Sequence, residues 1–166
     1  MATATYIPIA TQTLGSAAAS ITFSSIPGTY TDLRLVVSNA ITSAGDNLVI
    51  QINGDTGNNY SFTSLRAQGT AAVSGNSTST NRVLFDNSSS LSATVPQAYF
   101  IDIFSYAGST NKTVLGAAAA DGNGSGSVEL TVGLWRSTAA ITSITVKTDG
   151  GVNTFNTGTI FTLWGI

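Results

Sequence analysis

The chain has 166 residues, a length that fits a single domain over residues 1–166 with one hydrophobic core. Charged residues make up only 8 % of it and apolar residues 42 %, whereas ordinary globular domains carry about 25 % charged residues. The composition excludes a disordered chain of high charge, and the few scattered basic residues argue against nucleic acid or a membrane surface as partner. Because so little charge separates copies, we expect a protein that packs against itself or a partner.

Short runs of apolar and β-branched residues, separated by turn residues, recur along the chain, and no stretch keeps a 3.6-residue period. The first runs lie at 5–10 and 20–40, and Pro27 and Gly28 divide the second. The later runs lie at 47–54, 60–65, 81–85, 97–107, 113–120, 127–135, 141–148 and 159–166. About ten strands without helices predict an all-β fold, an antiparallel and jelly-roll-like β-sandwich, with a closed barrel as second choice.

Two polar stretches between these runs are predicted to be connections. QINGDTGNNYSF (51–62) is rich in Asn, Asp and Gly, and we interpret it as a hairpin-like turn. Its oxygen-bearing residues fit neither possible register of an EF-hand loop, so we expect no metal there. RAQGTAAVSGNSTSTN (66–81) is long and polar, and is predicted to be an exposed loop.

Apolar and polar residues alternate most clearly in the run at 127–135, which predicts a strand with its apolar face on the core. That face holds Val128, Leu130, Val132 and Leu134, and the opposite face holds Glu129, Thr131 and Gly133. The runs at 97–107 and 159–166 are instead apolar on both faces. Each is either a central strand covered by a long loop or part of a subunit interface. The candidate interface residues are Phe100, Phe104, Trp164 and Ile166.

The residue types needed for common catalytic sites are absent or scattered. The chain has no histidine and no cysteine, so neither a Ser–His–Asp triad nor a thiolate metal site can be built. Most acidic residues sit in or beside turns, where Asp is a turn former. Among the Asp residues, Asp102 alone lies in the middle of a strand, and we expect it beside an arginine or at an interface. We therefore expect neither an enzyme nor a bound cofactor.

Three stretches of the chain are similar to a known family: NGDTGNNYSF (53–62), GLWRSTAAITSITV (133–146) and TIFTLWGI (159–166). They resemble small β-rich virion structural proteins of tailed bacteriophages. In that family an Asn-rich turn followed by Tyr, a G-L-W-R-S-T segment and a final aromatic-Gly-Ile recur in this order. The resemblance covers most of the chain, but none of these motifs carries a chemical mechanism. It implies a place in the virion rather than a reaction.

Within a virion the resemblance implies two alternative functions. One is a capsid decoration (cement) protein, commonly a homotrimer, that sits on the outer capsid surface and binds the phage major capsid protein. The other is a tail-fibre or adhesin domain that binds host surface glycans, with Asn58, Asn59 and Tyr60 as the sugar contacts. The chain enters β structure within its first ten residues and shows neither coiled-coil heptads nor repeats, which favours the decoration protein.

Overall fold

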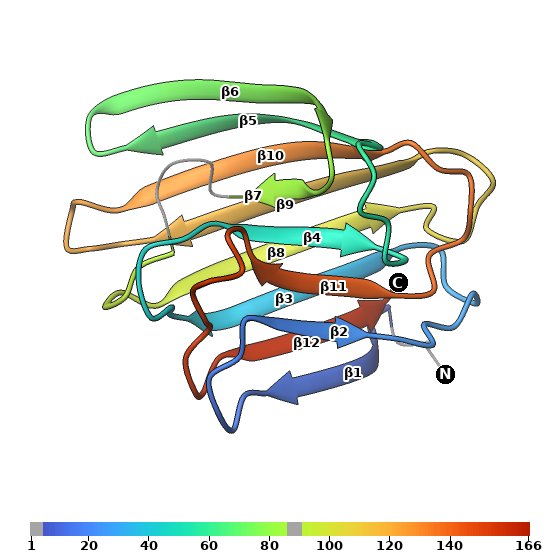
Figure 1. Ribbon diagram of the computed structural model, residues 1–166, viewed down its shortest axis with the longest axis horizontal. Helices are drawn as coiled ribbons and strands as arrows, with labels where there is room; N and C mark the ends of the chain where they lie inside the picture. The colour runs from blue at the N-terminus through green and yellow to red at the C-terminus, as the bar shows by residue number, and fades with distance from the viewer. Residues whose placement is uncertain (1–4, 86–90) are drawn as a thin grey trace.

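The computed structural model describes residues 5–85 and 91–166 (Figure 1). All secondary-structure elements in these two ranges are β-strands. The described residues form twelve strands: β1 (Ile7–Thr13), β2 (Ser20–Phe23), β3 (Leu33–Ala40), β4 (Leu48–Ile52), β5 (Tyr60–Gln68), β6 (Ala71–Thr80), β7 (Val83–Phe85), β8 (Gln97–Phe104), β9 (Lys112–Ala120), β10 (Ser127–Trp135), β11 (Ile144–Thr148) and β12 (Ile160–Gly165). They make two antiparallel sheets, so the predicted all-β antiparallel sandwich is confirmed.

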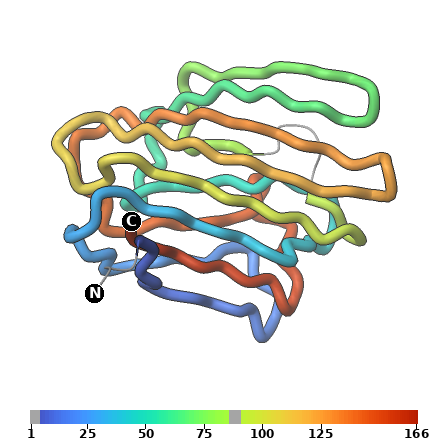
Figure 2. The backbone as a smooth tube through the Cα atoms, turned by 180° about the vertical axis from the view of Figure 1, so that it is seen from behind, coloured from blue at the N-terminus to red at the C-terminus, as the bar shows by residue number. Residues whose placement is uncertain are grey.

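The two sheets differ in size. The larger sheet has eight strands in the order β1-β12-β3-β8-β9-β10-β5-β6, and the smaller sheet has four in the order β2-β11-β4-β7. Two hairpins, β9–β10 and β5–β6, lie next to each other and form one half of the larger sheet (Figure 2). Without these two hairpins, the remaining strands make two four-stranded sheets, β1-β12-β3-β8 and β2-β11-β4-β7.

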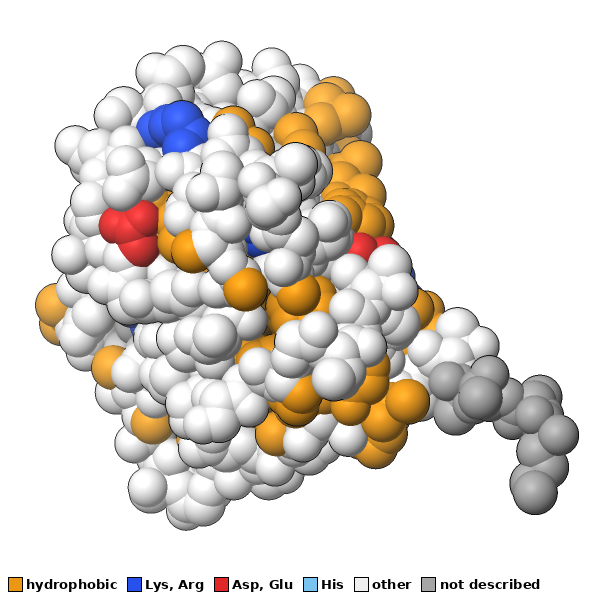
Figure 3. Space-filling view, turned by 90° about the vertical axis from the view of Figure 1, so that its right-hand side faces the viewer, with side chains coloured by type: hydrophobic (Ala, Val, Ile, Leu, Met, Phe, Trp, Pro, Cys, Tyr) orange, Lys and Arg blue, Asp and Glu red, His pale blue; other side chains and the backbone are white. Residues whose placement is uncertain are grey.

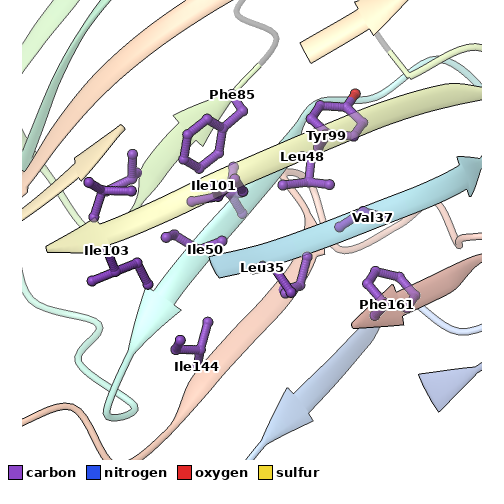
Figure 4. Packing of buried hydrophobic residues seen from close by; sticks show 14 of the residues in the cluster. Leu35, Val37, Leu48, Ile50, Phe85, Tyr99, Ile101, Ile103, Ile144 and Phe161 are labelled. Atoms are coloured by element: carbon purple, nitrogen blue, oxygen red, sulfur yellow. The ribbon is translucent and has the colours of Figure 1, made fainter. Parts of the chain in front are cut away.

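The core lies between the sheets and is built from alternate residues of facing strands. Leucine, isoleucine and aromatic side chains from β3, β8 and β12 meet those from β4, β7 and β11 (Figure 4). Two glycines let β7 approach the larger sheet closely. A Cβ on Gly133 would lie 2.5 Å from Val83 Cγ1, and a Cβ on Gly116 would lie 2.4 Å from Phe85 Cε1. Both distances are shorter than carbon atoms allow, so the packing of β7 requires glycine in β9 and β10.

The predicted loop at 66–81 is wrong, because most of it belongs to the hairpin of β5 and β6. β5 extends to Gln68 and β6 begins at Ala71, with Gly69 in the left-handed region at φ +57°. The sequence pattern does not predict β6, because none of its residues is buried and its apolar residues show no two-residue period. Its position is set by pairing with β5, which in turn pairs with β10 over its whole length.

The predicted hairpin at 51–62 is also wrong. β4 belongs to the smaller sheet, where it pairs with β11 and β7, and β5 belongs to the larger sheet. The Asn-rich stretch therefore carries the chain from one sheet to the other. Turn-forming residues indicate that the chain changes direction, but they do not show whether the next strand pairs with the previous one.

Candidate functional site

The face of the larger sheet that points away from the smaller sheet, here called the outer face, exposes many apolar side chains. One row crosses five strands through directly paired residues: Val36, Phe100, Ala117, Leu130 and Leu65. Leu65 is 60 % exposed and Phe100 is 48 % exposed. In Figure 3 hydrophobic side chains gather along the right-hand edge, on the side where the larger sheet lies.

The strand with the clearest alternation faces opposite to the sequence prediction. Val128 and Leu130 of β10 are 56 % and 49 % exposed on the outer face, and Val132 is exposed beside them. Glu129 and Thr131 point inward and are buried, and the Thr131 hydroxyl donates to Glu129 Oε1 at 2.8 Å. The cause is the close approach at Gly133. Since only glycine fits against Val83, the face that carries Gly133 must turn inward, and the apolar residues then turn outward.

The outer face is large enough for a protein interface. Strands β8, β9, β10 and β5 carry most of its exposed apolar side chains and cover roughly 19 Å by 26 Å, or about 500 Å². The whole outer face covers about 1,000 Å². A stable protein interface buries about 800 Å² on each partner, and the largest apolar patch on a monomer is about 300–600 Å². A shallow hollow of about 280 Å³ between Leu65, Ala117, Val128 and Leu130 offers space for a partner's side chain.

One ion pair supplies the charge on the outer face. Arg34 Nε and Nη2 donate to the two carboxylate oxygens of Asp102 at 2.6 Å each, which confirms that Asp102 lies beside an arginine. Arg34 Nη1 donates to the Tyr6 hydroxyl at 3.0 Å, and its Cζ lies 5.7 Å from the centre of the Phe100 ring. The bonds to Asp102 raise the pKa of Arg34, against the opposing effect of burial. The pair is neutral, so it adds no net charge to this face.

Three of the four candidate interface residues lie on this face. Phe100 and Phe104 are exposed on β8, and Trp164 is half-buried on β12, directly opposite Arg34 and in edge contact with Tyr6. Ile166 is half-buried after β12, and its backbone N–H donates to Asp32 O at 3.0 Å. Because Phe100 and Phe104 are 48 % and 40 % exposed, no segment within the described residues covers the outer face of β8. The sequence reasoning missed Leu65, Val128, Leu130 and Val132, because their alternation and turn context are those of core residues.

The glycan contacts proposed from the sequence are not brought together. Tyr60 is completely buried, and its hydroxyl accepts from Ile52 N at 3.0 Å and donates to Asp55 O at 3.0 Å. Burial raises the pKa of Tyr60 to about 12. Its ring stacks on Trp135 with centroids 6.4 Å apart, so no face of the ring is open to a sugar. Asn58 and Asn59 are exposed, but Asn59 Nδ2 is held by the Asp55 carboxylate at 3.0 Å.

The Asn-rich stretch is part of an internal hydrogen-bonded corner. The Asp55 carboxylate accepts from Trp135 Nε1 at 2.7 Å and from Gly57 N at 2.8 Å, and the bond from Trp135 is the main cause of its lowered pKa. Arg136 Nη2 donates to Asn58 O at 2.8 Å. Two of the three stretches that resemble virion proteins, 53–62 and 133–146, thus hold each other in place. Their role in this chain is to join the sheets.

The described residues contain no group of three or more His, Cys, Asp or Glu side chains placed to hold a metal ion. None of the described elements is a helix long and apolar enough to cross a membrane. A scan against family models, a search of curated proteins and a search of solved structures gave no match. The resemblance to phage virion proteins therefore stays a prediction.

Proposed function

We propose that this protein is a non-enzymatic structural protein of a phage virion, a decoration (cement) protein that binds the major capsid protein on the outer capsid surface. The observation that carries the proposal is the exposed apolar outer face of the larger sheet, with Leu65, Val128 and Leu130 at its centre. Covering such a face with a partner is favourable in free energy, because burial removes its apolar area from water.

The size of the apolar area indicates how such a protein would hold a shell. If the whole of the roughly 500 Å² on β8, β9, β10 and β5 is taken as apolar, its removal from water contributes at most about 12 kcal/mol from this protein's side at 25 cal/mol per Å². Association itself costs about 4–15 kcal/mol. A single copy therefore binds with a modest net free energy, and several linked copies bind much more tightly through avidity. This reasoning favours an oligomer of any symmetry, and the homotrimer that the resemblance implies is one such form.

The strand order supports a scaffold with an added binding surface. We infer that the eight strands left after removal of the β5–β6 and β9–β10 hairpins follow the strand order of a jelly roll, which has two four-stranded sheets. The two hairpins then extend one sheet, and they carry Leu65, Val128, Leu130 and Val132. Most of the exposed apolar area on the outer face thus lies on the hairpins, as expected if their role is to bind a partner.

Capsid binding tests this proposal directly. Purified protein is mixed with phage shells that lack it, and the bound fraction is measured by co-sedimentation. We expect the wild-type protein to bind and Leu130→Asp to lose at least tenfold in affinity, because a carboxylate would enter the apolar contact. Val152→Asp is the matched control, since Val152 is 87 % exposed but lies outside the larger sheet. Failure of the wild type to bind, or equal binding by Leu130→Asp, would contradict the proposal.

A further inference from the structure

The four edge strands of the two sheets differ in how well they are protected against pairing with another chain. In the smaller sheet, β2 and β7 are edges of only four and three residues. In the larger sheet, β1 carries Pro8 and an irregular register between Pro8 and Ala10. Short edges, proline and bulges are the features with which proteins block edge-to-edge pairing. Three of the four edges are therefore blocked.

The fourth edge, β6, has none of these features. It is ten residues long, AAVSGNSTST, and contains neither a charged residue nor proline. Its one register shift lies at the end where it joins Tyr60 and Phe62 of β5. Within the described residues, β5 is the strand that pairs with β6, and the opposite edge of β6 pairs with nothing. None of its residues is buried. The outward backbone N–H and C=O groups are free to bond a further strand.

We propose that β6 pairs antiparallel with β6 of a second copy of this chain across a twofold axis. Such pairing joins the two larger sheets into one continuous sheet. Two such strands that overlap over nearly their whole length exchange about eight to ten backbone hydrogen bonds. The facing side chains are Ala, Ser, Gly, Asn, Thr and a single Val, so no like charges meet and no bulky side chain keeps the backbones apart.

A second copy fits this edge better than a foreign peptide. Peptide strands that add to a sheet edge are selected by pockets for their alternate side chains. Two hollows that β6 residues help to line extend back over β5 and β10, and the side chains of β6 itself are small and exposed, so the described residues build no apolar pocket beyond its open edge. Self-pairing needs no such pocket, since the twofold axis doubles every backbone contact.

Pairing through β6 would also enlarge the apolar outer face. Ser74 of β6 lies directly opposite Leu65, and Leu65 lies opposite Leu130. In the joined sheet the outer faces of the two copies lie side by side on the same surface. The Leu65 side chains of the two copies are then separated by three strand spacings, or about 14 Å. The pairing stands independently of capsid binding and is tested with the isolated protein.

Disulfide trapping tests the pairing and its register. The chain has no cysteine, so each introduced cysteine reports on its own position. Single cysteines are placed at Ala72, Val73, Ser74, Gly75, Asn76 and Ser77, and dimer formation is measured after mild oxidation. A cysteine one residue away from the axis is displaced from its mate by about 6.6 Å along the strands and about 4.8 Å across them, or about 8 Å in all, which is too far for a disulfide. We expect one sharp maximum within β6 and a steep fall on both sides.

A charge variant tests whether the edge holds the copies together. Ser74→Lys with Asn76→Lys places four like charges around the axis, with position 74 directly opposite position 76 of the other copy when Gly75 lies on the axis, and we expect at least a tenfold weaker dimer by analytical ultracentrifugation. Thr11→Lys, on the opposite edge of the same sheet, is the matched control and should leave the dimer unchanged. The proposal is overturned if the wild-type protein is a monomer both at high concentration and after 100-fold dilution. A cysteine scan with no maximum in β6 also overturns it, and this test remains informative if the lysine variant fails to fold.

Discussion

Tyr60→Phe distinguishes an internal role for Tyr60 from a role at the surface. The substitution keeps the ring and its stacking on Trp135, and removes only the hydroxyl group. That hydroxyl is completely buried, accepts from Ile52 N at 3.0 Å and donates to Asp55 O at 3.0 Å. The variant leaves the completely buried Ile52 N–H without this acceptor.

The expected loss follows from the cost of an unsatisfied buried donor. Leaving one such group unpaired costs about 1–3 kcal/mol, so we expect the free energy of unfolding to fall by about 2 kcal/mol. For a chain of this size, 1 kcal/mol changes Tm by about 2–4 °C, which predicts a decrease of about 4–8 °C. Thermal unfolding followed by circular dichroism measures this change.

Tyr6→Phe is the matched control for this prediction. Tyr6 also uses its hydroxyl in a hydrogen bond, accepting from Arg34 Nη1 at 3.0 Å, but the residue is 43 % exposed. Water can replace the lost partner, so we expect a change within about 0.5 kcal/mol. Equal Tm values for Tyr60→Phe and wild type would refute the internal role, and an equal loss in both variants would refute the argument from burial.

Four further predictions follow from the same contacts. Burial in the folded state raises the pKa of Tyr60 to about 12, above the usual value near 10, so folding favours the neutral phenol. The contribution of this group to the free energy of unfolding is complete below pH 10 and is lost as pH rises through 12. Urea titrations across this range should show a smaller loss of unfolding free energy for Tyr60→Phe than for wild type. The pKa of Asp55 is lowered, so its contribution is present above its usual value near 4 and lost as pH falls through the folded-state pKa; Asp55→Asn should be less sensitive to acid than wild type in the same titrations. Gly133→Ala should cost about 1–3 kcal/mol in unfolding free energy, and Val83→Ala in the same chain should restore part of it, because the added Cβ would lie 2.5 Å from Val83 Cγ1; additive losses would count against this contact. Arg34→Lys should lower the free energy of unfolding by about 0.5–1 kcal/mol in chemical denaturation, since lysine cannot make both bonds to Asp102. If the loss in the double variant Arg34→Lys with Asp102→Asn equals the sum of the two single losses, the two side chains are not coupled.

Much of the local structure is predictable from the residues alone. Runs rich in Thr, Val, Ile and aromatic residues, bounded by Gly, Asn and Asp, correspond to eleven of the twelve strands that the structure describes. The position of Asp102 beside an arginine also follows from local reasoning, because a carboxylate in the middle of a strand needs a partner. The strand β6 could not be predicted in this way, since both of its faces are exposed and its sequence shows no periodic burial.

The same local reasoning fails for the orientation of β10 and for the path after β4. A two-residue period shows that two faces differ, but either face can point inward, and apolar residues alone do not decide which. Here the close approach of β7 at Gly133 decides, so Leu130 points outward and Glu129 inward. The turn residues between β4 and β5 likewise do not specify whether the strands pair or change sheets.

The sequence by itself therefore determines an all-β chain of low charge, with its turns and most of its strands, since these depend on local conformational preference and composition. Only the tertiary structure decides which apolar residues form the core and which remain exposed. That choice depends on contacts between strands far apart in the chain, such as Val83 with Gly133. It makes Tyr60 an internal residue and places Leu65, Phe100 and Leu130 on a surface that a partner can cover.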